Sequence, residues 1–176
     1  MVIIMDEIET KRFILKCVEK KYVNEIFNIL SNQKVIDNLN MNKHVNIDDT
    51  YNLLDKYYDG LEKRKMFPFE IIDKKNSNFI GIFLIKLDLY NDDSFEFTIY
   101  LDEKYWNNGI YSEILPYMVK YSFDKIKTNN FRGYVMEKNI ASRKVLEKNG
   151  FSLEKKFYVD GIDDMIYSYV MKRVVD

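Results

Sequence analysis

The stretch KYWNNGIYSE at residues 104–113 places asparagines and a glycine between a strand-like run and a helix-like run. At such a junction the first backbone N–H groups of the helix lack partners, and groups of this kind bind anions. The helix dipole adds about 0.3–1 kcal/mol to anion binding at an exposed site. Asn107 tolerates a positive φ better than other non-glycine residues, and Gly109 adopts one without cost. The stretch therefore indicates either a simple turn or a loop that holds an anionic cofactor.

The chain has one histidine and one cysteine, which narrows the chemistry open to it. His44 alone gives little support to a zinc site or a Ser–His pair, and we expect it to lie at the surface. Cys17 cannot form an internal disulfide and fits a reducing compartment; we expect it to be a small buried strand residue rather than a nucleophile. The sequence therefore predicts no metal site.

Length and charge exclude several classes of protein. With 176 residues, the chain has the length of one domain with its own core, and we expect residues 1–176 to form a single domain. Its 27 Lys and Arg residues nearly balance 28 Asp and Glu residues, which disfavours nucleic-acid binding. FIGIFLI is too short to span a bilayer, and MVIIMDE reaches acidic residues too soon for a signal peptide. We therefore expect a cytoplasmic protein with no membrane contact.

Hydrophobic periodicity and turn residues outline the elements that must position the 104–113 stretch. Alternation predicts strands, a period near 3.6 predicts helices, and Asp48 or Asp49 is expected to cap the second helix. The expected strands are 9–18, 67–73, 78–88, 94–101, 131–136 and two closing ones, and the expected helices are 19–32, 50–64, 110–125 and 140–149. Gly150 is expected to end the last helix in a left-handed conformation, and Pro116 to kink its helix or distort the first turn.

This order of elements predicts the fold class. Short turns between the three central strands favour an antiparallel meander, and later helices alternate with strands. We expect an α/β (α+β) domain with a mixed, mostly antiparallel twisted sheet of about seven strands flanked by about four helices.

Five segments, spread nearly from end to end, resemble the GNAT superfamily of acetyl-CoA-dependent N-acetyltransferases. Within it, the sequence is similar to the ribosomal-protein alanine/serine N-acetyltransferases (the RimJ/RimL-type group). The two longest segments, in this order and spacing, carry most of the resemblance. The segments are IETKRFILK, FIGIFLI, EFTIYLDEKYWNNGIYSE, NIASRKVLEKNGF and DDMIYSYVM.

The resemblance implies acetyl-CoA as co-substrate, with its pyrophosphate on the loop and no metal. The superfamily's loop pattern [Q/R]-x-x-G-x-[G/A] falls on residues 106–111, where Tyr111 stands in place of a glycine or alanine and would crowd the pyrophosphate unless it points away. The backbone of Ile99 and Leu101 is expected to pair with the pantetheine arm as a strand would. The implied loop ligands are Trp106, Asn107, Asn108, Gly109, Ile110, Tyr111 and Ser112.

The resemblance also assigns the chemistry at the amine. Glu96 falls on the superfamily's strand Glu and is expected to be the general base, directly or through water, although an ion-pairing strand residue would look the same. The tyrosine that protonates the thiolate in many members is replaced by Leu146, so Ser142 is the remaining candidate to assist it. Asn139 is expected to hydrogen-bond the cofactor arm; it is also a favoured helix N-cap, and the two roles can coexist.

The acceptor is left open by the sequence. A primary amine, such as a protein or peptide N-terminus, is the acceptor class that the resemblance favours. Two acidic groups at predicted strand ends could attract a cationic acceptor such as a polyamine, an aminoglycoside or a basic peptide terminus, but turn preference explains them equally well. The groups are Asp88, Asp92 and Asp93, and Asp160, Asp163 and Asp164. Two other readings stay open: a catalytically weak acyl-CoA-binding module and a protein-interaction domain without cofactor. Homodimers are common among similar proteins, and the sequence does not decide the oligomeric state.

Overall fold

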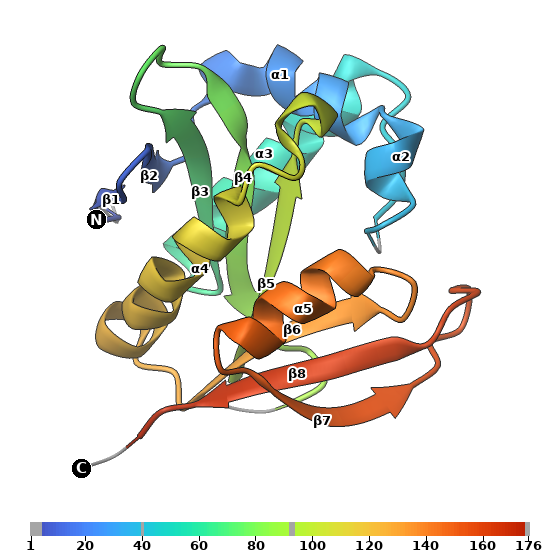
Figure 1. Ribbon diagram of the computed structural model, residues 1–176. Helices are drawn as coiled ribbons and strands as arrows, with labels where there is room; N and C mark the ends of the chain where they lie inside the picture. Colours follow the sequence, from blue (N-terminus) through green and yellow to red (C-terminus); the bar gives the residue numbers. More distant parts are fainter. Residues whose placement is uncertain (1–4, 40, 92–93, 175–176) are drawn as a thin grey trace. The chain divides into compact units, whose positions relative to one another are not determined.

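The computed structural model describes residues 5–39, 41–91 and 94–174, whose elements are labelled in Figure 1. The chain divides into two compact units, one up to Leu84 with Ile99–Ile110, the other comprising Ile85–Thr98 and the chain from Tyr111 onward. The division falls inside β4 (Phe79–Leu87) and β5 (Ser94–Leu101). The single domain expected over residues 1–176 stays a prediction.

The described strands form one mixed sheet of eight strands in the order β1-β2-β3-β4-β5-β6-β8-β7. This confirms the predicted α/β class with a mixed sheet. The count of eight exceeds the expected seven because the opening strand is divided by a turn at Thr10–Arg12 into β1 (Ile8–Glu9) and β2 (Phe13–Cys17). Within the described ranges, none of the helices has the length and apolar character that a membrane span requires.

The first unit packs helices against the early strands. β2 pairs antiparallel with both β1 and β3 (Met66–Asp73). The expected helix 19–32 consists of a 3-10 turn at Lys20–Tyr22 and then α1, and a short helix that the periodicity did not indicate follows it. The helices of this unit are α1 (Val23–Leu30), α2 (Gln33–Ile36) and α3 (Ile47–Glu62), and a second 3-10 turn spans Glu103–Tyr105.

An apolar cluster between α1, α3 and the strands forms the core of the first unit. Ile26 and Leu30 lie on one face of α1, Leu54 lies on α3, and all three are fully buried. Each such side chain contributes about 1.5–3 kcal/mol relative to an exposed one. This core supports β4 and the end of β5, from which the candidate loop emerges.

The start of α3 corrects one expectation from the sequence. The N-cap is Asn46, not Asp48 or Asp49: its side chain accepts from the Asp49 N–H at 3.1 Å, and the Asp49 carboxylate accepts from the Asn46 N–H in return. Asp49 is thus the third residue of a capping box. Asn and Asp cap helices almost equally well, so the local sequence could not decide between neighbouring polar positions.

The second unit joins the start of β5 to the C-terminal elements. β6 (Asn130–Met136) pairs parallel with β5 and antiparallel with β8 (Ile166–Lys172), which pairs antiparallel with β7 (Ser152–Phe157). The helix α5 (Ile140–Lys148) packs on β6 and β7 (Figure 1). α4 is assigned from Ile110 to Tyr121 without interruption at Pro116, and a π-helical turn at Ser122–Ile126 follows. Gly150 has φ +86°, which confirms the predicted left-handed helix stop.

Candidate functional site

The loop before α4 contains two residues with positive φ. Asn107 has φ +60° and Gly109 has φ +68°, as their residue types predict. Left-handed residues alternating with others turn successive N–H groups toward one side and form an anion-binding concavity. Since α4 begins at Ile110, its unpaired N–H groups and the positive end of its dipole follow directly.

Two side chains fix the shape of this loop. The indole nitrogen Nε1 of Trp106 donates to the Leu101 carbonyl at 3.1 Å, which ties the loop to the end of β5. The Asn108 amide Nδ2 lies 3.2 Å from the carbonyl oxygens of both Tyr105 and Trp106. The Trp106 side chain is thus already engaged inside the protein, so its contribution to a bound anion would come from the backbone.

The end of β5 leaves strand backbone beyond its parallel partner. The ladder between β5 and β6 ends at the pair Phe97–Gly133, whereas β5 continues to Leu101. On the other side, β4 approaches so closely that a Cβ on Gly81 would lie 2.2 Å from the Tyr100 carbonyl oxygen. This contact explains the glycine in FIGIFLI. Ile99 and Leu101 lie past the end of the parallel ladder, where the resemblance places the pantetheine arm.

The first residues of α4 differ in their surroundings. Ile110 is 4% exposed and anchors the helix start in the first unit. In the second unit, the ring of Tyr111 packs edge-on against Phe97 at 6.4 Å between centroids, and burial raises its pKa. The Tyr111 side chain is therefore a packing residue, and its predicted role is confined to its backbone N–H. Ser112 lies four residues before Pro116, which has no N–H to offer its carbonyl.

Glu96 is a buried carboxylate held by one cation. Its side chain lies in β5, the residue is 7% exposed, and Oε1 is 2.7 Å from Lys86 Nζ. Burial raises the pKa of Glu96 above its usual range, and Lys86 acts in the opposite direction. A carboxylate of this kind can accept a proton from an ammonium more readily than an exposed glutamate can. The ion pair considered for Glu96 is present, and it is compatible with a role as base.

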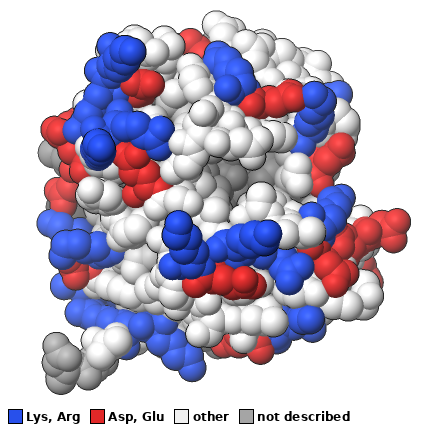
Figure 2. Space-filling model, viewed as in Figure 1, with Lys and Arg blue, Asp and Glu red and all other residues white. Residues whose placement is uncertain are grey.

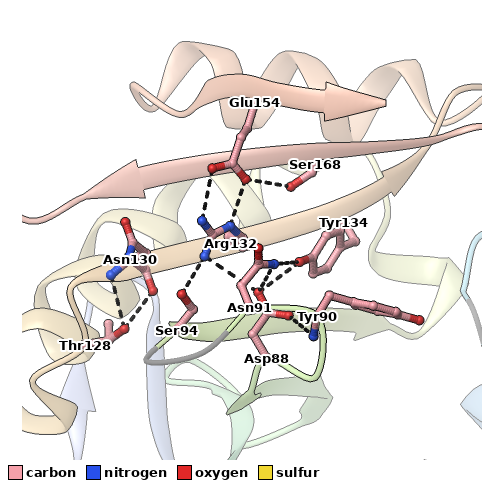
Figure 3. A network of polar contacts seen from close by, with 10 residues as sticks. All are labelled: Asp88, Tyr90, Asn91, Ser94, Thr128, Asn130, Arg132, Tyr134, Glu154 and Ser168. Carbon is pink, nitrogen blue, oxygen red and sulfur yellow. Dashed lines mark hydrogen bonds and ion pairs between the residues drawn. The ribbon is translucent and has the colours of Figure 1, made fainter. Parts of the chain in front are cut away.

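A buried network around Arg132 holds the start of β5 (Figure 3). The Arg132 guanidinium donates to both oxygens of Glu154 at 2.9 and 3.0 Å and lies 3.7 Å from Asp88. The Asp88 carboxylate also accepts from Tyr134 Oη and Asn91 Nδ2, at 2.9 and 3.0 Å. Arg132 pairs with Glu96 in the β5–β6 register, so this network fixes the strand that carries the proposed base.

Asn139 and Ser142 lie together at the start of α5. Asn139 Oδ1 accepts from the Ser142 N–H at 3.1 Å, so Asn139 is the N-cap of the helix. The cap uses only the side-chain oxygen, and the amide nitrogen can donate at the same time. Leu146, at the position of the superfamily's tyrosine, is fully buried and packs on Gly133, where a Cβ would lie 3.2 Å from it.

Two other polar candidates are structural rather than functional. His44 is 8% exposed and its Nδ1 lies 2.8 Å from Thr50 Oγ1, so the expected surface histidine is a buried one, and burial lowers its pKa. The Asp88 carboxylate pairs with Arg132 and accepts a hydrogen bond from Tyr134, so it does not serve to bind a cationic acceptor. Asp92 and Asp93 lie outside the described residues. Among the residues described, no group of three or more His, Cys, Asp or Glu could hold a metal.

Sequence reasoning missed the charged partners Lys86 and Arg132. Both interrupt strongly apolar strands, which was the only local signal available. Their partners are distant in sequence, and a strand register cannot be read from one sequence alone.

On the face shown in Figure 2, basic and acidic side chains are interspersed.

Comparisons with known proteins show the family and the fold of the chain. A family model described as an acetyltransferase (GNAT) domain matches residues 12–152. YjcK, a probable N-acetyltransferase of Bacillus subtilis strain 168, is 29% identical over 100 residues, which span 56% of this chain and 55% of that protein.

Two solved structures show the same fold at low sequence identity. RimL, a ribosomal L7/L12 alpha-N-protein acetyltransferase in complex with coenzyme A, has a TM-score of 0.82 at 17% identity and covers 95% of this chain and 98% of its own. A spermidine N-acetyltransferase from Vibrio cholerae, in complex with CoA and spermine, has a TM-score of 0.79 at 18% identity and covers 91% and 95%.

The mixed sheet and the match to the family model together identify the class of protein. The chain belongs to the GNAT acetyltransferase family, because the family model matches most of its length. This confirms the predicted family and the predicted N-acetyltransferase activity. Acetyl-CoA, the predicted co-substrate, is the acyl donor of this family.

Proposed function

We propose that this protein transfers the acetyl group of acetyl-CoA to the α-amine of a protein or peptide N-terminus. The observation that carries the proposal is the loop before α4, whose left-handed residues Asn107 and Gly109 orient backbone N–H groups in a chain of the GNAT family. The activity class follows from the family; the acceptor class, the site residues and their roles are our proposal. We further propose that it acts in the cytoplasm.

Backbone groups would hold most of the cofactor. The N–H groups from Asn107 to Ser112 offer the pyrophosphate several donors and the positive end of the α4 dipole. The backbone of Ile99 and Leu101 would pair with the pantetheine arm. The Leu101 carbonyl already accepts from Trp106, and a carbonyl oxygen can accept a second hydrogen bond. The Asn139 amide nitrogen would donate to the same arm.

Acetyl-CoA supplies an acyl thioester, from which the amine displaces the thiolate. Glu96 would accept the proton that the ammonium must lose before its nitrogen can form the C–N bond. The Ser142 hydroxyl would donate a hydrogen bond to the thiolate sulfur as the C–S bond breaks, and the thiolate would take up the second proton that the nitrogen loses in becoming an amide. A coenzyme A thiol, similar to cysteine with a pKa of about 8.5, is a fair leaving group, so strong acid assistance is not required.

The surroundings of Glu96 and Asp88 favour an α-amine over a polyamine. An α-amine has a pKa of about 8, against about 10.4 for a lysine-type amine, so it gives up its proton more readily to a carboxylate such as Glu96, whose pKa is raised by burial. A polyamine would also need several anionic partners, and Asp88 is buried and already paired with Arg132.

The test begins with calorimetry of acetyl-CoA binding to the full chain. It continues with thiol release on three acceptors: a peptide with a free N-terminus, the same peptide N-acetylated, and spermidine. We expect binding, turnover of the free peptide alone, and a loss of about 100-fold in kcat for Glu96→Gln with little change in acetyl-CoA affinity. Glu62→Gln, on the exposed end of α3, is the control.

Each other outcome removes a defined part of the proposal. No binding at millimolar acetyl-CoA would exclude the cofactor site. Binding without turnover of any amine would identify an acyl-CoA-binding module, and a preference for spermidine would replace the proposed acceptor. Full activity of Glu96→Gln would remove Glu96 from the mechanism.

A further inference from the structure

Arg12 lies next to the cofactor loop although 96 residues separate it from Asn108. Its backbone sits in the turn between β1 and β2, which is held by hydrogen bonds between Thr10 and Phe13 at 2.9, 3.0 and 3.4 Å. The Arg12 carbonyl also accepts from the Lys74 N–H at 2.9 Å. The side chain therefore starts from a fixed point of the first unit.

The guanidinium reaches the loop itself. Arg12 Nη2 donates to the Asn108 carbonyl oxygen at 3.0 Å, and Cζ lies 4.9 Å from the ring centroid of the buried Phe13. A Cβ on Gly109 would lie 3.8 Å from Arg12 Nη2. The contact with Phe13 limits the rotamers of Arg12 and keeps its charge beside the loop.

Because a peptide group is planar, this contact also determines the direction of the neighbouring N–H group. The carbonyl of Asn108 and the N–H of Gly109 belong to one planar trans peptide and point in opposite directions. Glycine allows both signs of φ, so the plane before Gly109 could otherwise rotate at little cost. A donor that fixes the carbonyl on one side therefore fixes the Gly109 N–H on the other.

The hollow that Arg12 shares with the loop is basic. It has a volume of about 430 Å³, and Lys11, Arg12, Lys74 and Lys75 line it together with Asp73 and Asn108. Lys74 is paired with Glu9 at 2.8 Å, whereas Arg12 makes the contact to the loop. Positive charge on this side adds attraction for an anion bound at the neighbouring N–H groups.

We propose that Arg12 is a positioning residue for the pyrophosphate loop: it fixes the Asn108 carbonyl so that the Gly109 N–H points to the pyrophosphate of acetyl-CoA. This inference rests on the proposed function. It predicts a donor-specific effect, because acetyl-CoA carries the pyrophosphate whereas S-acetylpantetheine, the truncated thioester, does not.

The test compares Arg12→Gln with the wild-type chain on both donors. We expect the KM for acetyl-CoA to rise about 10-fold, the loss typical of one hydrogen bond from a charged donor, with kcat nearly unchanged. The kcat/KM for S-acetylpantetheine should be unaffected. Arg12→Lys should restore part of the affinity, because it keeps the charge and one donor but not the planar fork.

Lys75→Gln is the matched control, because it removes one positive charge from the same hollow without removing a hydrogen bond to the loop. Its KM and kcat should equal those of the wild type with both donors. An Arg12→Gln chain that uses acetyl-CoA as the wild type does would overturn the inference, and so would equal losses with both donors. A loss as large for Lys75→Gln would assign the effect to charge alone and overturn the positioning role. If the wild-type chain does not bind acetyl-CoA, it is the proposed function that fails.

Discussion

Lys86 and Glu96 form the pair of side chains on which the proposed proton transfer depends. The two lie 2.7 Å apart, and Lys86 lowers a Glu96 pKa that burial raises. The carboxylate must be deprotonated to act as a base, so kcat/KM is expected to rise with pH through the Glu96 pKa. The partner lysine thus sets the lower end of the working pH range.

Replacing Lys86 with Met should therefore move the acidic limb of the pH–rate profile to higher pH. The reason is that the substitution removes the charge that stabilises ionised Glu96, and its pKa rises further. The measurement is kcat/KM against pH with a saturating peptide acceptor. Lys120→Met, an exposed lysine on α4, serves as control. An unshifted limb in Lys86→Met would show that another group controls the rate.

Gly109 is expected to be the least replaceable residue of the loop. At φ +68°, a β-branched residue is strained by about 1–2 kcal/mol or more, although a Cβ itself has room. Gly109→Val should relieve this strain by rotating the peptide and so abolish acetyl-CoA binding in calorimetry. Gly161→Val, at φ +83° between β7 and β8, carries the same backbone strain and serves as control. Equal affinity in Gly109→Val would contradict the loop assignment.

At the scale of secondary structure, we expect the stability of strand β6 to depend on its buried cation, Arg132. Arg132 is 5% exposed, and without it the buried Asp88 would lose the cation that lies 3.7 Å from it. Arg132→Met should lower the free energy of unfolding by about 3–5 kcal/mol. Adding Asp88→Asn should recover part of this loss, because it removes the unpaired charge.

Urea unfolding of the single and double variants measures this coupling, with Lys144→Met on α5 as an exposed control. If the losses of the two single variants simply add in the double variant, or if the double variant is less stable still, Arg132 does not stabilise the Asp88 charge.

Local sequence predicted most elements but not their partners. The strands, the helix stop at Gly150 and the left-handed loop residues followed from alternation and from residue types that tolerate positive φ. The division of the first strand at Thr10–Arg12 did not, because the alternating pattern of ETKRFILKCV continues through the turn that the hydrogen bonds between Thr10 and Phe13 hold. The cation beside Glu96 and the contact from Arg12 to the loop did not follow either, because each joins residues on different elements.

Stability of the whole molecule is expected to fall between acidic and neutral pH because of Glu70. This residue is fully buried, and its Oε1 has no hydrogen-bond partner among the described residues, while Lys16 Nζ lies 3.5 Å away. Burial raises the Glu70 pKa from 4.5 to about 7. The folded protein therefore keeps a proton that the unfolded chain releases, and the free energy of unfolding declines as pH rises through this window.

Glu70→Gln should remove this dependence. Relative to wild type, the variant should gain up to about 3 kcal/mol between pH 4.5 and 7, since each unit of pKa difference corresponds to about 1.4 kcal/mol. Urea unfolding at stepped pH values measures the gain. For Glu62→Gln, at an exposed position, the free energy of unfolding should depend on pH as it does in the wild type. The same pH dependence for Glu70→Gln would show that Glu70 ionises normally.

The bond between Trp106 and the Leu101 carbonyl gives the protein an optical reporter of its own. Trp106 is the only tryptophan in the chain, so all indole emission arises from this loop. A ligand that settles on the neighbouring N–H groups changes the polarity around the indole, and the emission spectrum should shift when acetyl-CoA is added. Stopped-flow fluorescence could then follow the association and release of the donor in real time, with no dye attached.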